Sequence, residues 1–114
     1  MKLVLSSQGH NKSDLVDVRF GRCKYFAIYD LETKTFDFVE NKGAESNQGA
    51  GIAAAQTVLD LKADALLTER LGPKAFRVLA DSGMKLYKCH GMTIEDAVNR
   101  FENHTYETID GPYR

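Results

Sequence analysis

The sequence predicts an α/β fold, in which helices pack against a mixed five-stranded sheet. The first 40 residues contain apolar and alternating runs with strand periodicity and no helical spacing. The rest of the chain alternates helical patterns with short apolar runs, which is typical of parallel strands joined by crossover helices. We therefore expect the order β-β-β-α-β-α-β-α in one domain, residues 1–103, followed by a C-terminal tail, residues 104–114.

The three N-terminal strands are predicted from residue type and alternation. Lys2–Leu5 is a short apolar run that suits a central strand, and a long polar loop, Ser6–Arg22, follows it. Tyr25–Leu31 is rich in β-branched and aromatic residues, and Thr35–Glu40 alternates apolar with polar residues. The short polar segment between them predicts an antiparallel hairpin.

Turn and capping residues divide the second half. We expect a helix from a glycine-rich entry at Asn47–Gly51 to about Leu61, and a second that begins at Gly72-Pro73 and ends at Gly83. Thr93 is predicted to cap the third helix, with Asp96 answering it. The strands between these helices are Ala63–Thr68 and Met84–Lys88. His104–Arg114 is interpreted as a loose tail.

Right-handed crossovers place the first strand in the middle of the sheet, beside the fourth. Ligands of open α/β sheets bind outside the carboxyl ends of the strands at such a point. Four segments should meet at that edge: Ser6–Arg22, Gln48–Gly51, Glu69–Lys74 and Cys89–Met92.

The stretch Gly49-Ala50-Gly51 has two interpretations. The first amides of the helix that follows have no internal partner and suit an anion. Alternatively, the small residues only permit close packing. Neither the dinucleotide fingerprint nor the P-loop motif is present.

Charges are distributed unevenly, although the formal net charge is only -1. This balance argues against a nucleic-acid or membrane partner. The predicted edge nevertheless collects more cations than acids, which suggests an anionic ligand, unless these charges are simply solvated. The cations are Arg19, Arg22, Lys24, Arg70, Lys74 and Lys88, and the acids are Asp14, Asp17 and Glu69.

The same edge is expected to hold soft metal ligands: His10, Cys23, Cys89 and His90. Thiolate and imidazole bind soft metals and iron–sulfur assemblies, and a neighbouring arginine would favour the Cys23 thiolate. Cys23 could equally point inward as a small hydrophobe.

An enzymatic function has little support in the sequence. Ser6, Ser7 and His10 lack a third orienting group, and no strand carries the carboxylates of a metal-dependent nuclease. The N-terminal apolar run is too short for a signal peptide, so we expect a cytoplasmic protein.

Several motifs occur together and in order. They are Arg19-Phe20-Gly21-Arg22-Cys23, Tyr25-Phe26, Gly49-Ala50-Gly51-Ile52-Ala53-Ala54-Ala55-Gln56, Gly72-Pro73-Lys74-Ala75-Phe76 and Thr93-Ile94-Glu95-Asp96-Ala97. From about Lys2 to Phe101 the chain resembles the dinitrogenase iron-molybdenum cofactor biosynthesis family, which includes nitrogenase cofactor carriers and orange proteins. Many carriers have histidine where this chain has Arg19.

This resemblance implies a ribonuclease H-like three-layer fold with sheet order 3-2-1-4-5. It also implies a non-catalytic carrier that binds an anionic metal–sulfur cluster without covalent attachment: an iron–molybdenum cofactor or precursor, an iron–sulfur cluster or a molybdenum–copper sulfide. Proteins that donate or accept the cluster would be its partners, and the chain would be a monomer or weak dimer. A regulatory or interaction module that binds a small anion or a protein partner without metal is the alternative.

The expected cluster-binding residues fall into two sets. Cations and small residues that would hold the cluster are Arg19, Phe20, Gly21, Arg22, Lys24, Gly49, Ala50, Gly51 and Gly72. The expected metal ligands are His10, Cys23, Cys89 and His90.

Overall fold

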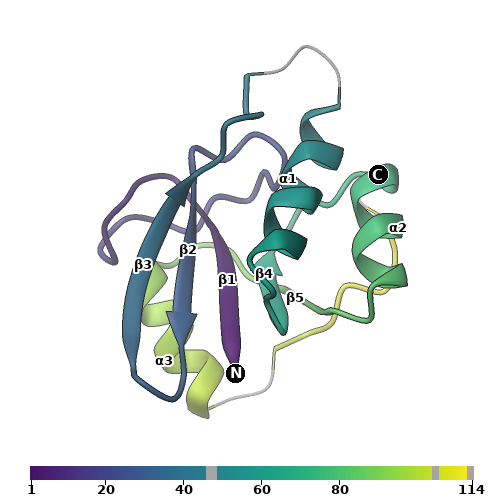
Figure 1. Ribbon diagram of the computed structural model, residues 1–114. Helices are drawn as coiled ribbons and strands as arrows, with labels where there is room; N and C mark the ends of the chain where they lie inside the picture. Colours follow the sequence, from purple (N-terminus) through teal and green to yellow (C-terminus); the bar gives the residue numbers. More distant parts are fainter. Residues whose placement is uncertain (46–48, 104–105, 113–114) are drawn as a thin grey trace.

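The computed structural model describes residues 1–45, 49–103 and 106–112 (Figure 1). Its elements follow the predicted order: β1 (Lys2–Ser7), β2 (Tyr25–Asp30), β3 (Thr35–Glu40), α1 (Ala50–Asp60), β4 (Ala65–Thr68), α2 (Pro73–Asp81), β5 (Lys85–Lys88) and α3 (Ile94–Asn103). Thr93 caps α3 as expected, because its hydroxyl accepts a hydrogen bond of 3.1 Å from the Asp96 amide.

The five strands form one mixed sheet in the order β3-β2-β1-β4-β5. β1 pairs antiparallel with β2 and parallel with β4, so it lies at the centre of the sheet as predicted. Leu5 is opposite Ala27 on one side and Leu67 on the other. The carboxyl end of β1 therefore lies at the same edge as the carboxyl ends of β4 and β5 and the start of β2.

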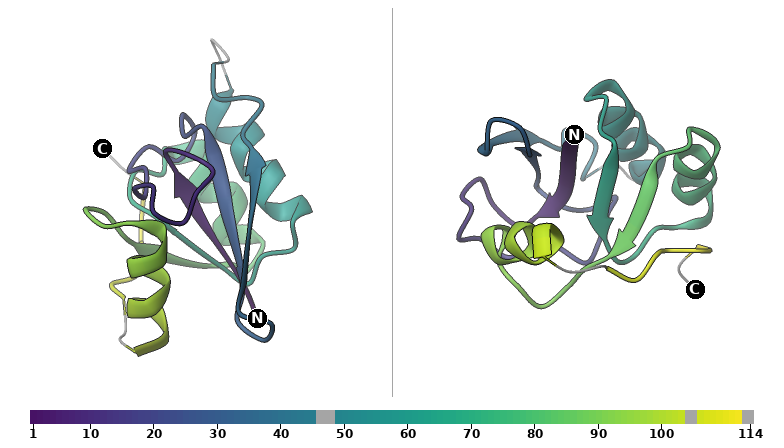
Figure 2. Two further views of the ribbon diagram at one scale, coloured as in Figure 1. Left: turned by 90° about the vertical axis from the view of Figure 1, so that its left-hand side faces the viewer. Right: turned by 90° about the horizontal axis from the view of Figure 1, so that it is seen from below.

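Helices cover both faces of the sheet: α1 and α2 lie on one face and α3 on the other (Figure 2). Successive strand residues point to opposite faces, so β1 contributes to two cores. Val4 is buried with α1 and α2, whereas Leu3 and Leu5 are buried with α3. Among the described residues, no helix is both long enough and apolar enough to span a bilayer.

β1 continues two residues beyond its predicted end at Leu5, because the hydroxyls of Ser6 and Ser7 find partners in the interior. Both serines are fully buried. The Ser6 hydroxyl lies 2.7 Å from that of Thr68 and also donates to the Asp17 carbonyl, while Ser7 donates to the Gly9 carbonyl. Polar residues can thus end a strand inside the protein when each hydroxyl is hydrogen-bonded.

The prediction of a loose tail is wrong for residues 106–109, here called the C-terminal strap. Tyr106 and Ile109 are buried. The Lys88 amide donates to the Glu107 carbonyl at 2.7 Å, and the Ile109 amide donates to the Leu86 carbonyl at 2.8 Å. The strap therefore runs along β5 as a short added strand. Residues 104–105 and 113–114 of the predicted tail lie outside the described residues.

Candidate functional site

The loops predicted to meet at the carboxyl edge of the sheet are joined there by backbone hydrogen bonds. The Val16 amide donates to the Met92 carbonyl at 2.9 Å, and the Arg70 amide donates to the Val18 carbonyl at 2.8 Å. Gly21 packs against the first turn of α1. The predicted convergence is confirmed, with Gln48 lying outside the described residues.

A hollow of about 280 Å³, here called the α1–α2 hollow, opens between the first turns of α1 and α2. Its lining residues are small or apolar apart from one lysine: Gly49, Gly51, Ile52, Gly72, Pro73, Lys74 and Ala75. The glycine-rich entry and the Gly72-Pro73 start thus form one feature.

Neither helix that borders the hollow has a side-chain hydrogen bond at its N-cap, Gly49 for α1 and Gly72 for α2. The first bonds inside the helices run from the Ala53 amide to Gly49 and from the Phe76 amide to Gly72. Earlier N–H groups have no partner within their helix and carry its partial positive charge. Two helix N-termini therefore offer donors to one hollow, an arrangement that suits an anion.

Small residues also permit close packing here, so both interpretations of the glycine-rich stretch apply. A Cβ on Gly21 would lie 3.0 Å from the Gly51 amide nitrogen, and one on Gly51 would lie 3.5 Å from the Ala75 Cβ. Phe20 is 1% exposed and Ala50 is 5% exposed. These last two predicted binding residues are therefore core residues in this conformation.

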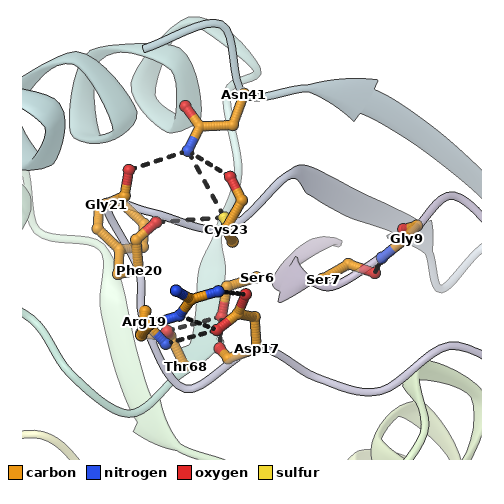
Figure 3. Close-up of polar contacts among 10 residues, drawn as sticks. All are labelled: Ser6, Ser7, Gly9, Asp17, Arg19, Phe20, Gly21, Cys23, Asn41 and Thr68. Atoms are coloured by element: carbon orange, nitrogen blue, oxygen red, sulfur yellow. Dashed lines mark hydrogen bonds and ion pairs between the residues drawn. The ribbon is translucent and has the colours of Figure 1, made fainter. Parts of the chain in front are cut away.

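The Cys23 thiol points into the core between the sheet and α1 (Figure 3). Its sulfur is 3.2 Å from the Phe20 carbonyl, to which the thiol donates, and the Asn41 amide donates to the Cys23 carbonyl at 2.8 Å. Burial raises the pKa of the Cys23 thiol to about 12. The expectation that a neighbouring arginine favours the thiolate is wrong, because the cost of desolvation dominates.

Cys89 is buried in the other core, against α3. Its sulfur lies 3.7 Å from the Tyr106 hydroxyl, and burial raises the pKa of this thiol as well. The remaining expected ligands are also apart: His90 pairs with Glu69 at 3.1 Å, and His10 stacks on Tyr25.

The four expected metal ligands are therefore not gathered into one site. The two thiols lie on opposite faces of the sheet, each sealed in its own core. Across the described ranges, no three His, Cys, Asp or Glu side chains are placed to hold a metal ion together. The order of the elements predicts that these segments meet at one edge of the sheet. It does not predict on which face of the sheet each side chain lies.

The predicted excess of cations is partly offset by acids. Arg19 forms a two-pronged ion pair with Asp17, with Nε 3.2 Å from Oδ1 and Nη2 3.1 Å from Oδ2 (Figure 3). Asp17 is 2% exposed, so this guanidinium balances a buried carboxylate. Lys88 pairs with Glu107 at 3.4 Å.

Two further predicted cations take different positions. Arg22 donates to the Ala44 carbonyl at 2.9 Å, which ties the end of the first long loop to the segment before α1. Lys24 lines a separate hollow together with Glu40 and Glu45, a lining of mixed charge. Lys74 was predicted only as one of the edge cations, and it is the lysine that lines the α1–α2 hollow.

Sequence analysis missed Asn41, which organises the loop around Cys23. Its amide nitrogen donates to the carbonyls of Gly21 and Cys23, at 3.2 and 2.8 Å (Figure 3). Among the described residues, its oxygen is a buried acceptor with no hydrogen bond. A single asparagine after a strand carries no motif, so only the three-dimensional structure identifies this role.

Comparison with known proteins adds to this geometry. The family model described as dinitrogenase iron-molybdenum cofactor matches residues 1–104. An uncharacterized protein of Methanocaldococcus jannaschii is 28% identical over 85 residues, which cover 72% of each chain. The chain is thus similar to an archaeal protein over most of its length.

Two solved structures are similar over nearly the whole chain. The apo form of the orange protein from Desulfovibrio gigas is 35% identical, with a TM-score of 0.93, over 99% of this chain and 96% of that one. A putative NifB protein from Thermotoga is 28% identical, with a TM-score of 0.85, over 99% of this chain and 97% of that one. On this evidence, the chain belongs to the dinitrogenase iron-molybdenum cofactor family.

Proposed function

We propose that the protein is a non-catalytic carrier that binds an anionic metal–sulfur cluster and exchanges it with proteins that donate or accept the cluster. Membership of the cofactor family and the similarity to the orange protein support this function. The candidate cargoes are an iron–molybdenum cofactor or precursor, an iron–sulfur cluster and a molybdenum–copper sulfide.

The α1–α2 hollow is the proposed binding site, and its two uncapped helix N-termini are the observation that carries the proposal. Sulfides at the surface of an anionic cluster accept hydrogen bonds, and the amides of the first helical turns are donors without a helical partner. The Lys74 ammonium at the rim adds a full positive charge. Together these groups would hold an anion without a covalent bond.

Cluster ligation by the cysteines is not part of this site. Cys23 is fully buried and Cys89 is 2% exposed, so each would have to leave its core to reach a cluster. A complex held by amides and cations needs no such opening. It also allows release to a partner, because hydrogen bonds and ion pairs exchange more readily than metal–thiolate bonds.

Two finer assignments accompany this proposal. We assign the three layers and the β3-β2-β1-β4-β5 order to the ribonuclease H-like class. We also infer a cytoplasmic location, which the two free cysteines support, because thiols persist in reducing compartments.

Gly72 offers a test that separates charge from folding. It has φ −65° and ψ 167°, and a Cβ added there meets no atom within 4 Å. Aspartate and serine are both favoured at an N-cap, so Gly72→Asp and Gly72→Ser should both fold. Anaerobic titration with tetrathiomolybdate, followed by visible absorption, should show binding about tenfold or more weaker for Gly72→Asp, because its carboxylate repels the anion. Gly72→Ser, the uncharged control, should bind more tightly than Gly72→Asp.

Equal affinities for Gly72→Asp and the parent would show that the hollow is not the binding site. Cys23→Ala and Cys89→Ala should bind tetrathiomolybdate as the parent does. A large loss in either variant would instead return the thiols to the ligand set.

The second candidate function is a module that binds a small organic anion without metal. The separation and burial of the two thiols favour it, as does the absence of a three-ligand metal group in the described part of the chain. Metal analysis of protein purified without oxygen distinguishes the two functions. Abundant iron or molybdenum would exclude this second candidate, whereas metal-free protein that binds carboxylates at the same hollow would support it.

A further inference from the structure

Asn41, the residue that follows β3, holds a buried oxygen that accepts no hydrogen bond. The residue is 3% exposed, and no group in the described part of the chain donates to its Oδ1. Figure 3 shows this oxygen on the side of the amide turned away from Gly21 and Cys23. The amide cannot turn over to find a partner, because its nitrogen donates to both of their carbonyls and the oxygen would then face two other oxygens. An unpaired buried acceptor is unfavourable, so it marks a place for a donor that the chain itself does not supply.

Asn41 lines the hollow that Lys24 lines, here called the Asn41 hollow, whose volume is about 310 Å³. This size lies at the lower end of small-molecule sites, which begin near about 300 Å³. Hydrogen bonds fix its backbone: the Asn41 amide donates to the Lys24 carbonyl at 2.9 Å, and the Ala44 amide donates to the Asn41 carbonyl at 3.1 Å. The Arg22 guanidinium holds the Ala44 carbonyl at 2.9 Å. The start of β2, the end of β3 and the turn after it therefore form a shaped hollow.

Charged side chains of both signs line the same hollow. Lys24 and Lys42 are the cations, and Glu40 and Glu45 are the acids. All four are exposed, and none forms an ion pair or a side-chain hydrogen bond with another residue of the described ranges. Because the lining is neutral as a whole, a ligand with a single charge gains little net attraction from it. A ligand that carries both charges can turn each one toward its opposite.

We propose that the Asn41 hollow binds a free α-amino acid, a small zwitterion. An ammonium group has three N–H donors and no acceptor, so it suits both the unpaired Asn41 oxygen and the carboxylates of Glu40 and Glu45. The α-carboxylate would pair with the two lysines. A purely anionic ligand does not fit, because its oxygens would face the Asn41 oxygen without a proton between them. The half-buried ring of Tyr25, also in the lining, offers apolar surface to the ligand's side chain.

This site is independent of the proposed carrier function, because the α1–α2 hollow shares no lining residue with it. Binding forms hydrogen bonds and ion pairs only, with no covalent step. The charged groups are exposed, so they are screened by solvent and each contributes modestly. We therefore expect a reversible complex that responds to millimolar amino acid.

Three related probes separate the two charges of the ligand: L-alanine, L-alaninamide, which lacks the carboxylate, and N-acetyl-L-alanine, which lacks the ammonium. Each is titrated into the full chain and followed by backbone amide chemical shifts in solution NMR. L-alanine should give saturable shifts at Lys24, Asn41 and Ala44, with a dissociation constant of about 1 mM. The other two probes should bind at least about tenfold more weakly, because each leaves one pair of lining charges unused.

Exposed members of the lining can be changed without disturbing the loop that Asn41 holds. Glu45→Gln and Lys42→Gln should each weaken L-alanine binding about fivefold, the effect of one partly screened ion pair. Lys42→Gln should also tighten L-alaninamide binding, because the lining becomes acidic. Glu32→Gln in the β2–β3 turn and Lys85→Gln on β5 are exposed controls outside the hollow and should leave both affinities unchanged.

Equal affinities for L-alanine and L-alaninamide would overturn the zwitterion proposal, as would equal losses in the lining variants and the controls. The absence of saturable shifts at Lys24, Asn41 and Ala44 would refute the site and leave the Asn41 oxygen to water. Gly72→Asp should bind L-alanine as the parent does, and Glu45→Gln should bind tetrathiomolybdate as the parent does. Failure of this site and failure of the cluster site are therefore distinguishable.

Discussion

Gly21 lies so close to Gly51 that a Cβ atom added to Gly21 would stand 3.0 Å from the Gly51 amide nitrogen and 3.1 Å from its Cα. The neighbour here is helix backbone, which cannot rotate away as a side chain can. Because Gly21 has no side chain, the loop that leads to Cys23 can lie directly against the first turn of α1.

Gly21→Ala should lower the free energy of unfolding by about 1–3 kcal/mol, because the loop or the helix must shift to admit the methyl group. The urea midpoint at constant slope measures this change. Gly72→Ser is the control: a Cβ there meets nothing within 4 Å, and serine is favoured at the N-cap of α2, so this variant should be neutral or stabilise by up to about 1 kcal/mol. Equal midpoints for the two variants would contradict the tight contact.

Arg19→Met should destabilise the protein by about 1–2 kcal/mol, because the buried Asp17 carboxylate loses its guanidinium partner. The Arg19 side chain is largely exposed, so solvent screens the ion pair and limits the loss of stability. Thermal unfolding in low salt measures the effect. Arg77→Met, on the exposed face of α2, serves as the control. If both variants lose the same stability, the Asp17 pair has no special role.

Alkaline pH should destabilise the fold in part through Cys23. Its pKa is raised from 9.0 to about 12, so the folded state holds the proton more tightly than the unfolded state. The stabilisation is complete below the unfolded pKa and decreases as the pH rises from 9.0 towards 12. The slope from this thiol is at most about 1.4 kcal/mol per pH unit.

Urea unfolding of the parent and of Cys23→Ala across this alkaline range measures that slope. The variant should start less stable near neutral pH and then lose stability more gradually than the parent. Cys89 and Tyr106 also have raised pKa values, so both the parent and Cys23→Ala should lose some stability with rising pH through these two groups. Parallel pH profiles would show that the Cys23 thiol is not held neutral by burial.

Ile109→Ala should cost about 2–4 kcal/mol, because Ile109 fills the core beneath α2 and the cavity left behind cannot close fully. Chemical denaturation measures the loss. Glu107→Ala, in the same strap but with an exposed ion pair to Lys88, should change stability by less than about 1 kcal/mol. An Ile109→Ala variant as stable as the parent would mean that the strap is detached in solution.

The sequence was sufficient to predict the order of the elements and the sheet, because periodicity and turn residues are local properties. β3 has its predicted bounds, and β1 lies at the centre of the sheet as crossover handedness requires. The convergence of the loops followed from that topology. These features depend on strand direction and on the periodicity of apolar residues, and not on the orientation of single side chains.

Side-chain direction near the strand ends could not be predicted in the same way. Cys23 precedes β2 in a loop, where strand alternation no longer fixes which face a residue enters, and its inward position depends on Asn41 holding the loop. Cys89 is covered by Tyr106, which is 17 residues further along the chain. The strap itself was missed because Tyr106 and Ile109 are isolated apolar residues among polar ones.

The β5 border of the sheet is shielded from pairing with another molecule, because the C-terminal strap occupies hydrogen-bonding groups of β5. On β3, the other outer strand, the Phe38 amide donates to the Asp37 carboxylate of its own strand. Exposed strand borders are templates for intermolecular sheet growth and aggregation. Detachment of the strap would uncover the β5 border, so a truncation before Tyr106 should make the protein prone to self-association as well as less stable.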